Sequence, residues 1–229
     1  MKRSILFFVL IISFCFVACG KKESDFKFWK VKDGITIKGY NGSVKDVVIP
    51  EKINGLPVDT ISDRAFAKNK LTSITLPNSI TYIGSGAFEK NKLTSITISN
   101  SITYIGNGAF AENKLTSITF SNSLTSIGDR AFMNNQLTNI TLPNSITYIG
   151  NGAFMNNQLT SITMPNSPTS IGQRAFENNQ LTSITLPNSI TYIDHYAFAK
   201  NQLTSVIVPN SIESLAFNAF DENVNIIRQ

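Results

Sequence analysis

The sequence predicts an α/β-type repeat solenoid in which 22-residue coils stack through a parallel β-sheet. The repeating unit, which begins at Leu71, reads LTSITLPNSITYIGSGAFEKNK. Its copies keep the same register and begin at Leu93, Leu115, Leu137, Leu159, Leu181 and Leu203. Apolar residues recur in fixed columns, and they alternate with polar residues where a strand is expected. A period of this length indicates a solenoid, in which each coil packs only against its neighbours.

The first 18 residues have the composition of a secretory signal peptide. Lys2 and Arg3 precede an apolar run that ends at the small residue Ala18. The run is too short to span a bilayer as a permanent helix. The sequence FVACG around Cys19 resembles a bacterial lipobox, which implies cleavage before Cys19 and lipid on its thiol. The alternative is an ordinary signal peptide that leaves Cys19 free.

Lipidation would make Cys19 the first mature residue, and residues 19–25 would then form a short tether. Two or more acyl chains hold a protein stably on a bilayer. In bacterial lipoproteins an Asp directly after the lipidated Cys favours inner-membrane retention, but Gly20 stands at that position here. We therefore expect a lipid-anchored protein of the bacterial envelope, at the outer membrane or cell surface.

Residues 26–60 predict an N-terminal β cap that leads into the first coil. Short alternating segments are separated by the turn pairs Asp33-Gly34 and Asn41-Gly42. A solenoid needs a terminal unit because an open end exposes strand edges and apolar surface, and Trp29 is among the aromatic residues that could cover it. The predicted organisation is a signal peptide at 1–18, a tether at 19–25, a cap at 26–60, a solenoid at 61–223 and a tail at 224–229.

Each coil is expected to begin with one strand, in which Ile74 and Leu76 point inward and Ser73 and Thr75 point outward. Ala87-Phe88 is expected to lie on a short helical turn. Two columns that recur in every coil are assigned to structure: a buried aromatic spine and a ladder of amides that joins neighbouring coils. These columns are Phe66, Phe88, Phe110, Phe132, Phe154, Phe176, Phe198 and Phe220, and Asn69, Asn91, Asn113, Asn135, Asn157, Asn179, Asn201 and Asn223.

A second pattern links two positions that are four residues apart in the coil. Where the first position is Tyr, as at Tyr104, the second is Gly, as at Gly108; where the first is Ser, as at Ser126, the second is Arg, as at Arg130. The pair Tyr192 and Tyr196 breaks this pattern. Residues four apart share a face when the chain is helical. We therefore expect the Tyr ring to cover the Gly, and an Arg stem to take its place where Tyr is absent.

The consensus L-x-x-I-x-L-P-x-x-I-x-x-I-G-x-x-A-F-x-x-N resembles the BspA-like, treponemal-type leucine-rich repeat of bacterial surface lipoproteins, over residues 47–223. Departures are local: Phe120 replaces a strand Leu, Pro168 replaces an Ile, and Asp194-His195-Tyr196 replaces Gly-x-Gly. The resemblance implies a curved solenoid with its sheet on the concave face, displayed at a cell surface. It also implies adhesion or protein binding, but it names no ligand.

The residue inventory argues against an enzyme. His195 is the only histidine, and the only cysteines are Cys15 and Cys19, so no Ser–His or Cys–His nucleophile is expected. His195 occupies a variable loop column, where it is expected to be a solvated substitution. No metal site or cofactor is expected, because Asp194 and His195 have no obvious third ligand. The net charge of +5, which would fall to +3 without residues 1–18, does not indicate nucleic-acid binding.

Two surfaces are candidates for binding. The first comprises the outward strand columns, which are neutral and hydroxyl-rich: Ser73, Thr75, Ser95, Thr97, Ser117, Thr119, Asn139, Thr141, Ser161, Thr163, Ser183 and Thr185. The second is a basic strip near the tether: Lys68, Lys70, Lys90, Lys92 and Lys114. The strip could face anionic lipid or acidic glycan. Equally, Ser and Thr simply tolerate an exposed parallel sheet, and the lysines could be a solvated edge.

The function that these observations favour is non-enzymatic: a surface-anchored binding or adhesion protein whose partner is a host or neighbouring-cell protein or glycan. One alternative is a structural envelope protein without a specific ligand. Another is an ice-binding type of solenoid, because Ser-x-Thr ladders on a flat sheet resemble ordered hydroxyl arrays.

Overall fold

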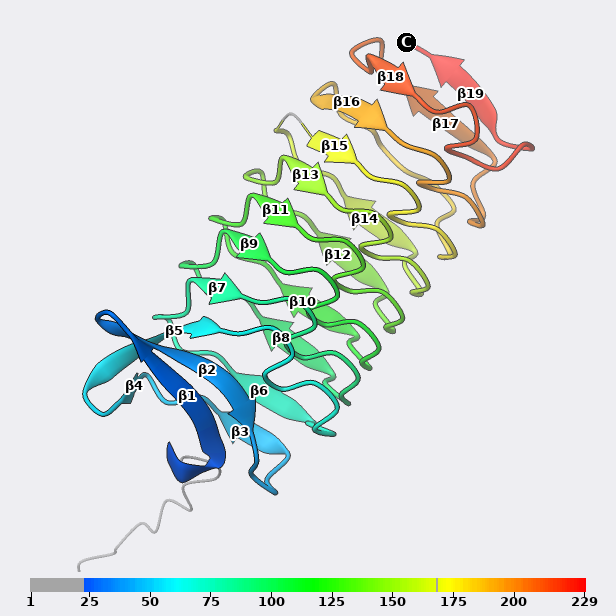
Figure 1. Ribbon diagram of the computed structural model, residues 1–229. Coiled ribbons are helices and arrows are strands. Elements are labelled where there is room, and N and C mark those ends of the chain that lie inside the picture. The colour runs from blue at the N-terminus through cyan, green and yellow to red at the C-terminus, as the bar shows by residue number, and fades with distance from the viewer. Residues whose placement is uncertain (1–22, 168) are drawn as a thin grey trace, which may run out of the picture.

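The computed structural model describes residues 23–167 and 169–229, which form one solenoid of stacked coils (Figure 1). The predicted signal peptide, the lipidation site Cys19 and the substitution at Pro168 lie outside the described residues. Among the residues that are described, no helix is long and apolar enough to cross a membrane. The single helix found there is the 3₁₀ turn η1 (Glu23–Asp25), which leads into the first strand.

The expected N-terminal β cap is present. Strand β1 (Phe26–Val31) runs antiparallel to β2 (Gly34–Tyr40), and the turn between them contains Lys32 at a φ of 51°. Strand β2 then pairs in parallel with β5 (Leu56–Ile61), against which β4 (Lys52–Ile53) folds back. The rings of Phe26 and Tyr40 close the end of the core against Phe66, at centroid distances of 6.3 and 5.7 Å. The cap therefore extends the sheet and covers the first coil.

Most coils contribute two strands rather than the single strand expected, and these form two sets on different sides of the coil stack (Figure 1). The first set contains β6 (Ser73–Thr75), β8 (Ser95–Thr97), β10 (Ser117–Thr119), β12 (Asn139–Thr141), β14 (Ser161–Thr163) and β17 (Ser205–Val208). Strand β3 (Asp46–Val48) precedes this set and β19 (Asn225–Arg228) ends it. This set is not one continuous sheet, because its strands pair only as β3–β6, β8–β10, β12–β14 and β17–β19, and residues 183–186 form no strand.

The second set was missed by the sequence reasoning, yet it makes the larger sheet. It contains β7 (Tyr82–Ile83), β9 (Tyr104–Ile105), β11 (Ser126–Ile127), β13 (Tyr148–Ile149), β15 (Thr169–Ile171), β16 (Ile190–Ile193) and β18 (Ser214–Leu215). These strands pair in parallel, coil after coil, and they continue the cap strands into one 11-stranded sheet. The long sheet thus runs the whole length of the described solenoid.

The helical turn expected at Ala87-Phe88 is not formed. The segment contains two isolated turns, and Gly86 and Lys90 interrupt them with φ values of 60° and 57°. The amide of Phe88 donates to the carbonyl of Ala109 in the next coil at 2.7 Å. Because backbone donors at this corner bond from coil to coil, they are not available for an α-helix.

The buried Phe column is confirmed as the spine of the core. Seven of its eight rings are completely buried, and Phe220 at the C-terminal end is 4% exposed. Successive rings stack at centroid distances of 5.1 to 5.4 Å, with interplanar angles no greater than 16°. The predicted strand alternation also holds, because Ile74 is buried while Ser73 and Thr75 are exposed. The spine fixes the distance by which one coil advances on the next.

The Asn column ties neighbouring coils together as expected. Asn135 illustrates the pattern: its Oδ1 accepts from the amide of Leu115, and its Nδ2 donates to the carbonyls of Phe110 and Phe132. The same bonds recur from Asn91 to Asn201. The two ends of the column differ, because Asn69 bonds to the cap at Tyr40 and Asn223 is exposed. In the interior coils the amide satisfies backbone groups that the turn would otherwise leave unpaired.

Candidate binding surfaces

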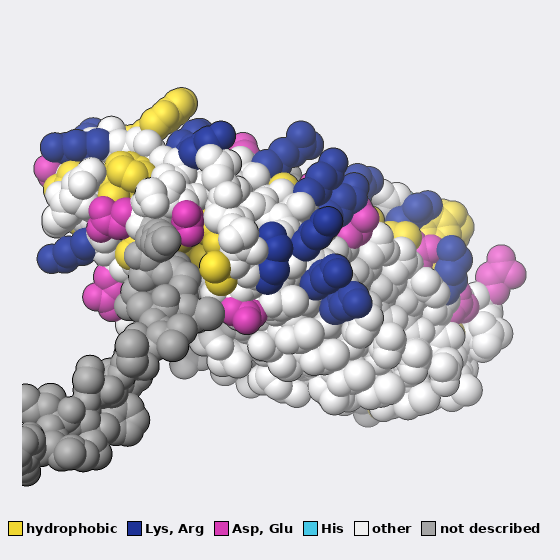
Figure 2. Space-filling view, turned by 90° about the horizontal axis from the view of Figure 1, so that it is seen from below, with side chains coloured by type: hydrophobic (Ala, Val, Ile, Leu, Met, Phe, Trp, Pro, Cys, Tyr) yellow, Lys and Arg dark blue, Asp and Glu magenta, His cyan; other side chains and the backbone are white. Residues whose placement is uncertain are grey.

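The outward columns of the first strand set form a face that we call the hydroxyl face, made of the twelve Ser, Thr and Asn residues named above from Ser73 to Thr185. All twelve are exposed. Neighbouring strands align like with like, so that Ser117 lies beside Ser95 and Thr119 beside Thr97. Among the described residues, none of the threonine hydroxyls on this face has a hydrogen-bond partner. Figure 2 shows a broad surface on which neither charged nor hydrophobic side chains gather.

The five lysines of the predicted basic strip are all exposed, and they lie in two columns of the coil. Lys68 and Lys90 follow the Phe column, whereas Lys70, Lys92 and Lys114 precede the first strand. Lys90 is paired with Glu89 at 3.3 Å and with Glu112 at 3.2 Å. Hydrogen bonds to Glu112 and then Glu89 raise the pKa of Lys90, so the lysine stays charged but its charge is compensated. Lys and Arg side chains gather in one band with acidic groups among them (Figure 2).

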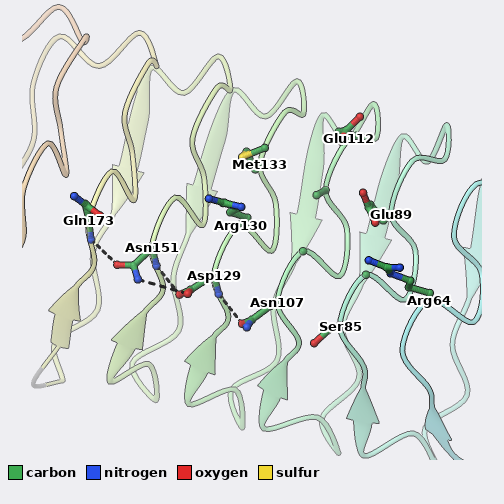
Figure 3. Close-up of a pocket in the computed structure, with 13 residues that line it drawn as sticks. Arg64, Ser85, Glu89, Asn107, Glu112, Asp129, Arg130, Met133, Asn151 and Gln173 are labelled. Carbon is green, nitrogen blue, oxygen red and sulfur yellow. Dashed lines mark hydrogen bonds between the residues drawn. The ribbon is translucent and has the colours of Figure 1, made fainter.

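A groove, which we call the edge groove, runs across the corner that follows the long sheet (Figure 3). It has a volume of about 610 Å³, and a second groove of about 530 Å³ continues it past Arg130 towards Arg174. A ladder of polar side chains lines it: the amide of Asp129 donates to Asn107 Oδ1 at 2.9 Å, and that of Asn151 donates to Asp129 Oδ1 at 2.8 Å. The sequence reasoning did not identify this groove.

One column of the groove has a left-handed backbone in seven coils. Its occupants are Arg64, Gly86, Gly108, Arg130, Gly152, Arg174 and Tyr196, with φ values between 55° and 62°. Only glycine adopts this conformation without a steric penalty. The column therefore explains why Gly recurs there, and it shows that Arg and Tyr are tolerated on the same backbone.

This geometry corrects the expected cover of Gly by Tyr. A Cβ added to Gly108 would meet no atom within 4 Å, and one added to Gly86 would meet Arg64 Cγ of the preceding coil at 3.3 Å. The Arg stem therefore lies against the Gly of the next coil, and the Tyr ring does not. The expectation failed because it assumed a helix, whereas Tyr104 lies in a strand and Gly108 in the turn after it. A cation–π contact in this column joins Arg174 and Tyr196, at 5.4 Å.

The outer face of the long sheet carries a row of aromatic side chains, which we call the tyrosine row: Tyr82, Tyr104, Tyr148 and Tyr192. Three of the rings are 38 to 42% exposed, and Tyr104 is half-buried. Tyr104 also joins the row to the edge groove, because its hydroxyl lies 3.3 Å from Asn107 Oδ1. Burial, and then nearby charges that include Asp129, raise the pKa of Tyr104 and Tyr148. Tyr104 and Tyr148 are therefore neutral at physiological pH.

His195 is half-buried rather than freely solvated. Its Nδ1 lies 2.6 Å from Asn218 Oδ1, and its ring meets Phe217 edge-on at 5.7 Å. These contacts tie the last coils together, which is a structural role. Within the described ranges, no group of three His, Cys, Asp or Glu residues is placed to hold a metal ion.

A family model described as BspA type leucine-rich repeat region matches residues 39–160 and 103–227. A leucine-rich repeat protein from Bacteroides ovatus is 23% identical over 89% of this chain, with a TM-score of 0.63. This chain spans 65% of the length of that structure. The pneumococcal vaccine antigen PcpA is 19% identical over 89% of this chain and 86% of its own, with a TM-score of 0.51. No curated protein sequence matches. At these identities the solved structures support the fold alone.

Proposed function

Because the chain belongs to the BspA-type leucine-rich repeat family, we propose that it is a non-enzymatic binding protein of a bacterial cell surface. In this proposal a lipid on Cys19 anchors the chain to the outer membrane. The solenoid then presents its repeated exposed columns to a host or neighbouring-cell protein or glycan.

The observation that carries this proposal is the contrast between the two kinds of column in each coil. The Phe and Asn columns complete the core and the turns by themselves, and they are buried in the interior coils. The hydroxyl face and the tyrosine row remain exposed, and the threonine hydroxyls of the former have no partner within the described part of the chain. Columns that the fold does not use, repeated at one spacing along a rigid array, suit a ligand that makes many equivalent contacts.

The anchor is supported by the lipobox-like sequence around Cys19 and by the short stretch that separates it from η1 at Glu23. A Cys19→Ala variant of the full chain tests it in a bacterium that processes lipoproteins. We expect labelled palmitate to be incorporated into the parent chain but not into the variant. Protease added to intact cells should digest the parent chain. Equal labelling of both chains would contradict lipidation at Cys19, and protection of the parent chain would contradict surface display.

Binding is tested with cells that display the full chain, compared with cells that lack it, on a glycan array and on extracellular-matrix proteins. We expect retention that depends on the displayed chain. A triple variant, Thr119→Val, Thr141→Val and Thr163→Val, asks whether the hydroxyl face is the contact surface, because it removes three hydroxyls while keeping the side-chain shape. A salt titration asks whether the lysine strip contributes, since screening weakens contacts between exposed charges. Equal retention of both cell types on every surface would favour the structural envelope alternative.

A further inference from the structure

The tyrosine row belongs to one register line that crosses the whole long sheet. Trp29 lies opposite Thr36, Thr36 beside Thr60, and Thr60 beside Tyr82. The line then continues in parallel register from coil to coil. Its later members are Tyr104, Ser126, Tyr148, Ser170, Tyr192 and Ser214. Because alternate residues of a strand point to opposite faces, all these side chains share the outer face of the sheet.

From Tyr104 onward the line alternates with a period of two coils. Tyr104, Tyr148 and Tyr192 occupy every second strand, which places neighbouring rings about 10 Å apart at the usual strand spacing. Ser126 and Ser170 fill the strands between them. In these same Ser coils, four residues later, the left-handed column carries Arg130 and Arg174. The backbone thus repeats every 22 residues, whereas the exposed Tyr and Arg side chains repeat every 44 residues.

The arginines stand where the fold does not require them. Gly86, Gly108 and Gly152 show that glycine is sufficient at this column, and a left-handed backbone is unfavourable for Arg. Arg130 has no carboxylate within salt-bridge distance among the described residues, so its guanidinium is available to an anion. Arg174 stacks on Tyr196 at 5.4 Å and lies 3.6 Å from the buried Glu177 carboxylate, which hold its side chain in place.

The polar ladder of the edge groove lies between the tyrosine row and the left-handed column that carries the arginines (Figure 3). Asn107, Asn151 and Gln173 present amides there, and Asp129 is the carboxylate of the ladder. Glu89 and Glu112 also line the groove, and both are paired with Lys90. Asp129 Oδ1 already accepts from the amide of Asn151, so its remaining lone pairs can accept from ligand hydroxyls. This carboxylate disfavours a densely charged ligand such as a nucleic acid, because like charges repel. It favours a ligand in which hydroxyls separate the anionic groups.

We propose that the tyrosine row, the edge groove and Arg130 and Arg174 bind an acidic polysaccharide laid along the solenoid axis, with one anionic group in each disaccharide. The Tyr rings would pack against the C–H faces of alternate sugars, since the face of an aromatic ring carries partial negative charge. The arginines would pair with the anionic groups of the sugars between them. This inference rests on the proposed binding function and places its glycan site on the long sheet rather than on the hydroxyl face.

The chain offers two variants that use residues already present at the same columns. Tyr148→Ser installs the side chain of the neighbouring strands, and Arg130→Gly installs the glycine of the neighbouring coils, so both should fold. The chain used in the test starts at Gly20, which omits the predicted signal peptide and the lipidation site and keeps every residue of the described core from Phe26 onward. Its affinity is measured by calorimetry for oligosaccharides of hyaluronan, unsulfated chondroitin and heparosan, each with one carboxylate in each disaccharide, and with a chitin hexasaccharide as the neutral probe.

We expect at least one acidic oligosaccharide to bind, and to bind roughly tenfold tighter than the chitin probe, because each anionic group gains a charge-assisted contact. Each variant should weaken that binding by roughly tenfold, and Arg130→Gly should also reduce its salt dependence. The control Thr141→Val, on the hydroxyl face, should leave it unchanged.

The inference is overturned if none of the acidic oligosaccharides binds, if the chitin probe binds as tightly as they do, or if both variants retain the parental affinity. These results differ from a failure of the proposed function. Cells that display both substitutions and still adhere to the array would keep the binding function and refute this site alone.

Discussion

The clearest quantitative test of the coil architecture is Asn135→Ala, in the middle of the amide ladder. The substitution removes the acceptor that the described residues give the buried Leu115 amide, at 3.0 Å. It also removes one donor from each of the carbonyls of Phe110 and Phe132, but Asn113 and Asn157 still donate to these oxygens. An orphaned buried amide costs about 1–3 kcal/mol, and each weakened bond about 0.5 kcal/mol more. We therefore expect the free energy of unfolding to fall by about 2–4 kcal/mol.

The assay is urea denaturation of the chain that starts at Gly20, followed by circular dichroism. Because solenoids need not unfold in one step, native-state hydrogen exchange at the Leu115 amide supplies a local measurement. Asn223→Ala is the matched control, since Asn223 occupies the same column but is exposed at the C-terminal end. A loss below about 0.5 kcal/mol for Asn135→Ala, or unchanged protection of the Leu115 amide, would refute the role assigned to the ladder.

Three further predictions follow from the core, the turns and the tyrosine row. Phe132→Ala should destabilise the chain by about 3–5 kcal/mol in the same denaturation assay, whereas Phe217→Ala, at an 89% exposed ring, should change stability by less than about 0.5 kcal/mol. Gly106→Ala should prevent native folding, as judged by circular dichroism, because its Cβ would lie 2.6 Å from a backbone carbon of the preceding coil. Gly108→Ala meets open space at a φ of 62°, so it should cost only about 1–2 kcal/mol. The pKa of Tyr148 is raised from its ordinary value of 10.0 by burial first and by Asp129 next, so tyrosinate absorbance should appear at higher pH in the folded than in the denatured chain. The linked stability should be present below pH 10 and lost as the pH rises through the folded pKa.

Features that recur in every coil were predictable from the sequence because the chemistry of each side chain allows only one kind of environment. A Phe at each coil must be buried, and an Asn three residues later can bond the turn of its own coil and the next. The second strand was missed for an equally physical reason. Tyr82–Ile83 spans two residues, which is too short for an alternating pattern, and its pairing partners are in other coils. The interruption of the first strand set at residues 183–186 has no counterpart in the sequence, where LTSITL is unchanged.

The candidate site was not predicted because the segment from Tyr104 to Gly108 was expected to be helical. The alternation of Tyr with Ser and of Gly with Arg was visible in the sequence, but a helical reading placed both positions on one face. In the structure Tyr104 lies in a strand, and the left-handed turn that follows sends Gly108 into the edge groove.

The left-handed column separates the stability of the solenoid from its recognition chemistry. Gly86, Arg130 and Tyr196 have φ values within 5° of one another, so exchanging them leaves the backbone course unchanged. The exchange from Gly to Arg costs about 1–2 kcal/mol of local strain, which is small against the burial of one Phe per coil. A duplicated coil can therefore keep its core and acquire a new exposed side chain at this one position. If the side chains of this column determine which ligand binds, Gly108→Arg should add a cation to the left-handed column one coil before Arg130. The variant should keep the fold and bind an acidic polysaccharide more tightly than the parent chain.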